Sequence, residues 1–281
     1  MSFDITMQSI FIGGLEIRFY SLMILSGLLV GVVIGQREAR RLGEDPEHVV
    51  NIAVIGAVLA LIGARIYHVL DRDQWPYYRD NPGQIIAIWS GGIGIWGGIL
   101  GGFVAAAAYS AWAKYPVAVI ADLTAPALLF VQTIGRLGDI VNGEHCAKAT
   151  DFFFGFNWTN PNSDARICDN GVGVGVQPVI AYEMIWNMLA LFIIWRLRGK
   201  LKPDGMIYAL YLALYSTGRF AVSFAREDKV WALGLQEAQY IALIVLAITV
   251  PLLVAKARFW SQEEGLLAST LVVRQRGSRA E

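Results

Sequence analysis

Seven long apolar stretches, separated by short polar segments, run along almost the whole chain. They cover residues 20–35, 49–70, 93–112, 117–141, 179–197, 206–224 and 236–255. A helix needs about 20 mostly apolar residues to cross a bilayer. The pattern therefore predicts an all-α, polytopic integral membrane protein with about seven transmembrane helices. The segment IIAIWSGG, just before the third stretch, predicts a short interfacial or re-entrant piece.

Composition agrees with this class of protein. Of the 281 residues, 56% are hydrophobic and 16% are charged, whereas a soluble domain has about 25% charged residues. Basic and acidic residues balance, and no basic patch alternates with aromatic residues, so we expect no nucleic-acid partner. The N-terminal stretch MSFDITMQSIF has no Lys or Arg, whereas a signal peptide begins with a positively charged region, so we expect the first apolar segment to be retained. No repeat divides the chain, which predicts one membrane-embedded domain over residues 1–281 with a short cytoplasmic tail at 257–281.

The basic residues of the loops predict the orientation of the helices. Most of them fall on one side of the predicted membrane, among them Arg37, Arg40, Arg41, Arg196, Arg198, Lys200 and Lys202. Loops rich in Lys and Arg remain in the cytoplasm. The N-terminus is then outside and the C-terminus inside, and the long loop at residues 143–177 is external.

Both cysteines of the chain, Cys146 and Cys168, lie in this loop. An oxidising exterior permits a disulfide between them. Two unpaired thiols are the alternative, and the sequence leaves both possibilities open.

Three arginines, Arg65, Arg136 and Arg219, interrupt apolar stretches. A charge at the centre of a bilayer costs about 2.5–3.5 kcal/mol on insertion scales, so each arginine calls for a reason. Each could reach the external headgroups or pair with Asp139, Glu144 or Glu183. The other interpretation is a shared anionic ligand, because guanidinium groups bind phosphate with planar, bidentate hydrogen bonds. In a membrane that phosphate belongs to a lipid headgroup.

The remaining polar and glycine-rich features have structural and functional interpretations. The segment GGIGIWGGILGG contains the GxxxG pairs Gly97/Gly101 and Gly98/Gly102, which indicate close helix packing or a backbone that lines a substrate cavity. Tyr20, Tyr182 and Tyr215 lie at or within helix ends, where tyrosine often anchors a helix at the interface. His68 and His145 are isolated. No HExxH, GxSxG or CxxC pattern occurs, so zinc and serine-hydrolase sites have little support.

Six segments, in order along the chain, resemble motifs of the bacterial prolipoprotein diacylglyceryl transferase family. GRLGDIVNGEH is similar to the family signature Gly-Arg-x-Gly-Asn-x-x-Asn-x-Glu. RFYSLMILSG, GARIYHV and IWSGGIGIWGG resemble the first-span, second-span and glycine-rich motifs. QPVIAYE resembles the (His/Gln)-Pro-x-x-x-Tyr-Glu motif, and YSTGRF the sixth-span Tyr-x-x-x-Arg motif.

The resemblance implies a function at the outer leaflet of the bacterial plasma membrane. The family transfers the diacylglyceryl group of phosphatidylglycerol to the lipobox cysteine of a preprolipoprotein signal peptide, forming a thioether and releasing glycerol phosphate. No cofactor or metal is implied. The residues expected at catalytic positions are Arg136, Arg219, Asp139, Glu144 and Tyr20. Those expected at substrate-binding positions are Arg136, Asn142, Tyr215, Arg65, His68, Tyr182, Glu183, Trp96, Gly97 and Gly98.

Three positions depart from the family pattern. Asp139 stands in place of the signature asparagine, His68 in place of a tyrosine, and Trp96 in place of a histidine that has been proposed as the base. The candidates for the base here are Asp139, Glu144, His68 and a tyrosine. Because Asp139 follows Arg136 by three residues, the two share a helix face and we expect an ion pair. A lipid or anion transporter, a lipid-binding protein and a repurposed family member remain alternatives.

Overall fold

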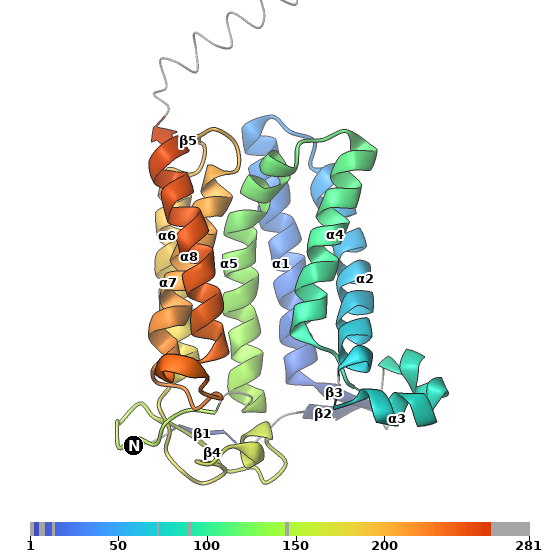
Figure 1. Cartoon of the computed structure of the whole chain (residues 1–281), viewed down its shortest axis with the longest axis vertical. Coiled ribbons are helices and arrows are strands. Elements are labelled where there is room, and N and C mark those ends of the chain that lie inside the picture. Colours follow the sequence, from blue (N-terminus) through green and yellow to red (C-terminus); the bar gives the residue numbers. More distant parts are fainter. Residues whose placement is uncertain are drawn as a thin grey trace, which may run out of the picture. The chain divides into compact units, whose positions relative to one another are not determined.

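The computed structural model describes residues 3–5, 9–12, 15–71, 73–88, 91–143 and 146–259. Long α-helices dominate this part of the chain (Figure 1). They are α1 Phe19–Leu42, α2 Glu47–Leu70, α4 Ile95–Ala113, α5 Val117–Asn142, α6 Val179–Leu197, α7 Met206–Ser223 and α8 Glu237–Lys256. Each coincides with a predicted apolar stretch, so the all-α prediction is confirmed. Of the described helices, all of these except α7 are long and apolar enough to cross a membrane, and the spanning role of α7 stays a prediction.

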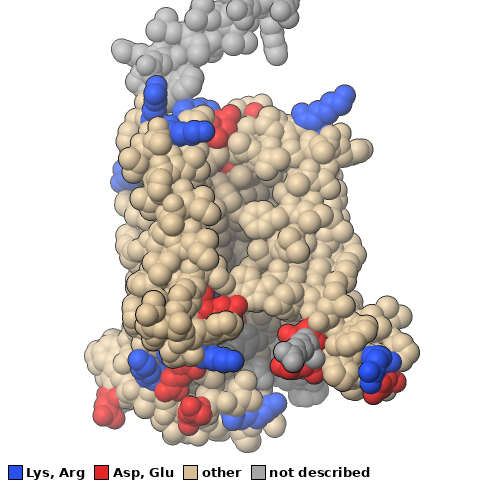
Figure 2. Space-filling view, viewed as in Figure 1, with Lys and Arg blue, Asp and Glu red and all other residues tan. Residues whose placement is uncertain are grey.

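The surface of these helices suits a lipid environment. Large apolar side chains such as Leu29, Leu100, Ile185 and Val254 are exposed along these helices. On the face in Figure 2, charged side chains gather toward the helix ends. Soluble monomers rarely expose apolar surface on this scale, whereas a bilayer solvates it and requires helices that satisfy their own backbone hydrogen bonds.

The chain divides into two compact units. Residues 1–31 and 124–281 form the first, here called the α5–α8 unit, and residues 32–123 form the second, here called the α2–α4 unit. The prediction of a single membrane domain remains a prediction.

Close packing of α2 on α4 organises the α2–α4 unit. Gly97 and Gly101 are buried, and a methyl group at either position would overlap the backbone of α2 at Gly63 or Leu59. The packing interpretation of the glycine-rich segment is therefore confirmed for these two glycines. Between α2 and α4 lie the short helix α3 (Trp75–Asp80) and the 3₁₀ helix η1 (Pro82–Ile86).

The α5–α8 unit has an apolar core that includes Leu129, Leu191, Ile194 and Ile207. At one end, β5 (Leu201–Lys202) pairs with β6 (Arg258–Phe259). At the other end α5 and α7 finish and α6 and α8 begin, and this end is here called the loop end.

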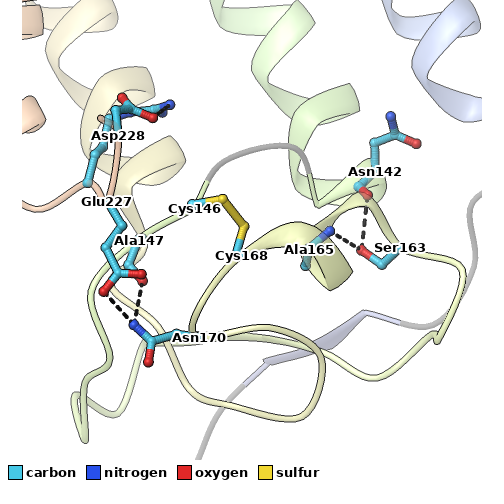
Figure 3. Close-up of a disulfide and its surroundings, with 10 residues drawn as sticks. Asn142, Cys146, Ala147, Ser163, Ala165, Cys168, Asn170, Glu227 and Asp228 are labelled. Atoms are coloured by element: carbon cyan, nitrogen blue, oxygen red, sulfur yellow. Dashed lines mark hydrogen bonds and ion pairs between the residues drawn. A yellow bond between two sulfur atoms is a disulfide. The ribbon is translucent and has the colours of Figure 1, made fainter. Parts of the chain in front are cut away.

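Short elements precede α1 and lie in the segments that follow α5 and α7. They are β1 (Phe3–Ile5), which runs parallel to β4 (Phe156–Trp158), the hairpin of β2 (Ser9–Ile12) and β3 (Leu15–Arg18), η3 (Asp164–Ile167) and η4 (Ala232–Gly234). A disulfide joins Cys146 to Cys168 (Figure 3). Of the two possibilities left open for these cysteines, the structure therefore has the disulfide.

Candidate active site

Helix ends bring two of the three arginines together at the loop end of the α5–α8 unit. Arg136 lies in the last two turns of α5, and Arg219 in the last two turns of α7. Glu183 lies in the first two turns of α6. Because α6 begins where α5 and α7 finish, these three side chains meet although they are far apart in the sequence.

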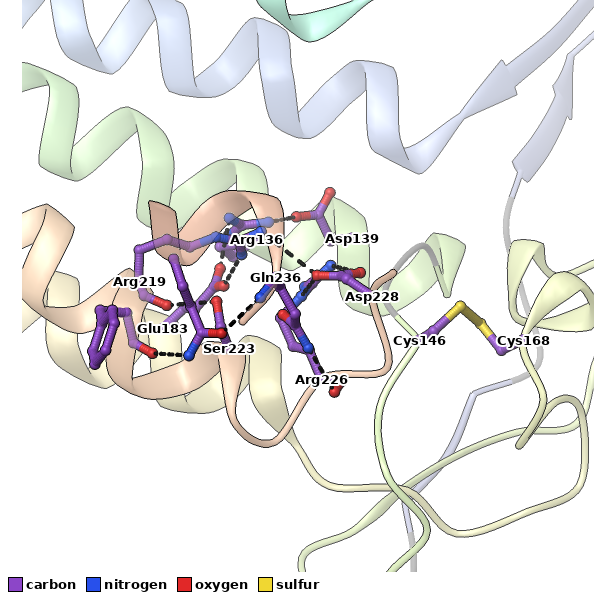
Figure 4. Close-up of polar contacts among 12 residues, drawn as sticks. Arg136, Asp139, Cys146, Cys168, Glu183, Arg219, Ser223, Arg226, Asp228 and Gln236 are labelled. Atoms are coloured by element: carbon purple, nitrogen blue, oxygen red, sulfur yellow. Dashed lines mark hydrogen bonds and ion pairs between the residues drawn. A yellow bond between two sulfur atoms is a disulfide. The ribbon is translucent and has the colours of Figure 1, made fainter. Parts of the chain in front are cut away.

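Glu183 bridges the two guanidinium groups (Figure 4). Its Oε2 atom lies 2.5 Å from Arg136 Nη2, and its Oε1 atom accepts a 2.6 Å hydrogen bond from Arg219 Nη1. Arg136 Nη1 also donates to Asp139 Oδ2 at 2.6 Å. The ion pair predicted from the three-residue spacing of Arg136 and Asp139 is confirmed.

The chain of ion pairs continues into the segment after α7. Arg219 Nη2 lies 3.9 Å from Asp228 Oδ2. Asp228 in turn accepts two hydrogen bonds from Arg226, from Nε at 2.6 Å and from Nη2 at 3.0 Å. We call the six residues Arg136, Asp139, Glu183, Arg219, Arg226 and Asp228 the arginine cluster.

The cluster is shielded from solvent. Asp139, Glu183 and Arg226 are buried, and the side chains of Arg136 and Arg219 are mostly covered. A buried charge is tolerated only with a partner, and removing one partner of a buried pair costs about 3–5 kcal/mol. The alternation of guanidinium and carboxylate groups therefore lets three arginines occupy the inner part of the protein.

Two members of the cluster, Arg226 and Asp228, were not among the residues predicted from the sequence. Arg226 follows Arg219 by seven residues, which is about two helical turns, so the sequence could have suggested that the two lie on one helix face. This spacing could not have identified Asp228 as their shared partner, since α7 ends at Ser223 and both Arg226 and Asp228 lie beyond it.

Three other predicted residues lie near the cluster. Tyr215 lines a small pocket together with Glu183 and Arg219. Tyr20 lies against Gly138, where an added methyl group would meet its ring. Asn142 is the last residue of α5, and its backbone oxygen accepts a 3.0 Å hydrogen bond from Ser163 Oγ (Figure 3). Glu144 and His145, the next two predicted polar residues, lie outside the described residues.

Tyr182 lies on a different face of α6 and borders an apolar pocket between α6 and α7. Its hydroxyl donates to Gln177 Oε1 at 2.8 Å. The pocket has a volume of about 730 Å³. Trp186 and Gly218 line both this pocket and the small pocket beside Glu183. A methyl group at Gly218 would overlap the indole of Trp186, so this glycine makes room for the ring that separates the two pockets.

Arg65, the third arginine, belongs to the α2–α4 unit and holds backbone oxygens. All five of its N–H groups have carbonyl acceptors, at 2.5–3.3 Å, on Gln84, Ile85, Ala87, Gly91 and Gly92. Gly91 and Gly92 have φ angles of +86° and +76°, a conformation that favours glycine. Arg65 thereby fixes the loop that leads from η1 to α4.

The other predicted residues of the α2–α4 unit surround this loop and helix. The ring of His68 lies against Gly92 and makes an edge contact with Tyr78, with ring centroids 5.8 Å apart. Trp96 is exposed at the start of α4, and Gly98 is in ordinary contact with Ala64. Within the described part of the chain, no group of three His, Cys, Asp or Glu side chains could hold a metal ion.

Comparison with known proteins agrees with the motifs. The family model described as prolipoprotein diacylglyceryl transferase matches residues 8–255. Phosphatidylglycerol–prolipoprotein diacylglyceryl transferase of Lysinibacillus sphaericus is 34% identical over 239 residues, covering 84% of this chain and 87% of its own length. The transferase of the same name from Streptococcus pyogenes serotype M5 is 33% identical over 248 residues, covering 88% and 93%. The chain therefore belongs to the prolipoprotein diacylglyceryl transferase family.

Proposed function

We propose that this protein transfers the diacylglyceryl group of phosphatidylglycerol to the thiol of a lipobox cysteine in a preprolipoprotein signal peptide. The product is a thioether, and glycerol phosphate leaves. Family membership supports this reaction, because the relatives are named as this transferase and match this chain over most of their length. The arginine cluster supplies the physical reason that this chain is suited to it.

The observation that carries the proposal is the bridge made by Glu183 between Arg136 and Arg219. Two guanidinium groups that share one carboxylate are spaced to share another small oxyanion. Phosphate oxygens accept the same charge-assisted hydrogen bonds as carboxylate oxygens. We therefore assign the binding of the lipid phosphate to Arg136 and Arg219, with Tyr215 beside them.

The reaction is a displacement at the glyceryl carbon that carries the phosphate ester. The lipobox sulfur forms a bond to this carbon, the C–O bond to the phosphate breaks, and its electron pair leaves with glycerol phosphate. The thiol proton passes to a base. Guanidinium groups close to the departing oxygen stabilise the charge that develops there.

The candidates for the base differ in their contacts and in their positions. Asp139 is held 2.6 Å from Arg136, which fits a structural role for its carboxylate. Glu144 lies outside the described residues, and His68 lies in the α2–α4 unit. A thiol has a pKa of about 8.5 in water, so a base or a nearby cation is needed at neutral pH.

The site faces the outer leaflet of the bacterial plasma membrane in this proposal. The support is the distribution of Lys and Arg, which assigns the loop at residues 143–177 to the outside. Single cysteines introduced at Asn160 and at Lys200 test it, because the native cysteines are joined in a disulfide and do not react with maleimide. We expect an impermeant maleimide to label position 160 in intact cells and position 200 only after lysis. The reverse pattern would put the arginine cluster at the wrong leaflet.

A reconstituted transfer assay tests the activity. The purified full chain is mixed with phosphatidylglycerol labelled in its diacylglyceryl part and with a lipobox peptide. A peptide with serine in place of the cysteine is the control. We expect label on the cysteine peptide alone, in a linkage that resists thioester cleavage. Lipid binding without transfer would instead favour the lipid-binding alternative and would refute the proposed activity.

A further inference from the structure

Asp228 is the outermost carboxylate of the arginine cluster. Its side chain is 33% exposed, against 7% for Glu183 and 9% for Asp139. It is therefore the most accessible of these three carboxylates to a ligand (its place in the cluster is shown in Figure 4).

The two arginines beside Asp228 are held very differently. Arg226 donates to both of its oxygens, at 2.6 and 3.0 Å. Arg219 Nη2 lies 3.9 Å away, beyond hydrogen-bonding distance. Asp228 is thus hydrogen-bonded to Arg226, and its 3.9 Å approach to Arg219 is an electrostatic contact without a hydrogen bond.

The two residues that precede Asp228 are held by hydrogen bonds. The backbone oxygen of Arg226 accepts a 3.1 Å hydrogen bond from Gln236 Nε2 at the start of α8. Asn170 Nδ2 donates to Glu227 Oε1 at 2.6 Å, close to the Cys146–Cys168 disulfide (Figure 3). Asp228 is therefore held near Arg219 without closing on it.

Charge balance gives this arrangement a consequence. Among the described residues joined by these ion pairs, three guanidinium groups face three carboxylates, so the cluster is neutral when all of them are ionised. A phosphate adds a negative charge. Its interaction with an arginine of the cluster is most favourable where the contact that it replaces is weakest. Contacts of 2.5–2.6 Å hold Arg136 and Nη1 of Arg219. The contact at Nη2 of Arg219, at 3.9 Å, is the longest of these ion-pair contacts, so a phosphate oxygen can replace it at low cost.

We propose that Asp228 is a displaceable counter-anion, which neutralises Arg219 in the resting protein and yields it to the phosphate of the lipid substrate. It is a positioning residue that sets the affinity of the phosphate site, and this role rests on the proposed function. Asp228 keeps its two hydrogen bonds to Arg226 throughout, so exchange on Arg219 requires no refolding of the segment.

Two substitutions with opposite expected signs test this role. Asp228→Asn removes the competing charge, and Asp228→Glu keeps the charge and extends it by one methylene toward Arg219. Asp204→Asn is the matched control, since Asp204 forms an exposed pair with Lys202 before α7 begins. The full-length protein is assayed for the KM of phosphatidylglycerol, for kcat, and for binding of glycerol phosphate without peptide.

We expect Asp228→Asn to lower the KM and the dissociation constant of glycerol phosphate by about threefold, as removal of a weak, partly exposed pair should, without an increase in kcat. Asp228→Glu should raise both by a similar factor, and it carries the test if the Asn variant fails to fold. The control should change neither. A raised dissociation constant in the Asn variant, or no change in either variant, would overturn the proposal. Because glycerol phosphate binding needs no transfer, a failure of the proposed activity would be seen separately.

Discussion

Arg65 and Arg219 are the same residue type in similar sequence settings, yet their partners differ in kind. Arg65 donates all five N–H groups to backbone carbonyls of one loop. Among the described residues, the charged partners of the Arg219 guanidinium are the side-chain carboxylates of Glu183 and Asp228. Carbonyls in a loop cannot leave without unfolding it, whereas a carboxylate side chain can exchange with another anion.

The kind of acceptor around a guanidinium group therefore indicates whether that arginine can take part in a reaction. A guanidinium saturated by backbone acceptors shapes the protein, and one paired with carboxylates can bind a substrate anion. The sequence treats Arg65, Arg136 and Arg219 alike, as charges within apolar stretches. The acceptors around each side chain separate them, and each prediction below tests that separation.

The largest effect is expected from removing a guanidinium of the cluster. Arg136→Ala or Arg219→Ala should abolish transfer, since the proposed mechanism needs both guanidinium groups to bind the phosphate. Lysine at either position should restore little activity, because an ammonium offers a point charge without the planar fork. Transfer rates of membrane-inserted protein measure this, with Arg196→Ala on the exposed surface of α6 as control. Near-normal transfer by a well-expressed Arg219→Ala variant would remove the phosphate-binding role.

Glu183→Gln should reduce both activity and stability. The amide keeps the shape of the bridge and loses its charge, which leaves Arg136 and Arg219 poorly neutralised. Breaking a buried ion pair in this way costs about 3 kcal/mol. Thermal unfolding in detergent and the transfer rate would both be measured. A variant as stable as the wild type would show that the bridge contributes little in the membrane.

Arg65→Lys should separate stability from chemistry. Lysine has three donors and cannot satisfy five carbonyls, so the unfolding temperature should fall by several degrees. The turnover per folded molecule should fall much less than in Arg136→Lys. Equal loss of turnover in the two variants, at equal stability, would break the distinction between Arg65 and the arginine cluster.

The sequence could predict the helices and one contact of the site. Apolar stretches of membrane length define each helix by themselves, and the spacing of Arg136 and Asp139 is local to α5. The bridge of Glu183 could not be predicted, because its partners come from α5 and α7. The contacts of Arg65 could not be predicted either, because its acceptors are backbone oxygens, which every residue type has. Motif resemblance supplied the candidate functional residues without saying which arginine contacts which acceptor.

The smallest effect is expected at Asp139, where this chain departs from the family signature. If Asp139 only holds Arg136, Asp139→Asn should retain most activity with little change in pH dependence, because an amide oxygen can still accept the hydrogen bond. A base could not be replaced in this way. A collapse of activity at neutral pH, with recovery toward the pKa of the thiol near 8.5, would assign the proton transfer to Asp139.

Quantifying both products of the reaction tests the proposed transfer and the role of Arg219 in it. Glycerol phosphate and thioether peptide are quantified by mass spectrometry in a single time course, for the wild type, Arg219→Lys and Arg65→Lys. We expect one glycerol phosphate for each thioether in the wild type, a turnover that nearly vanishes in Arg219→Lys, and a largely retained turnover in folded Arg65→Lys. Thioether formed at the wild-type rate by Arg219→Lys, or formed without release of glycerol phosphate, would contradict the proposed mechanism.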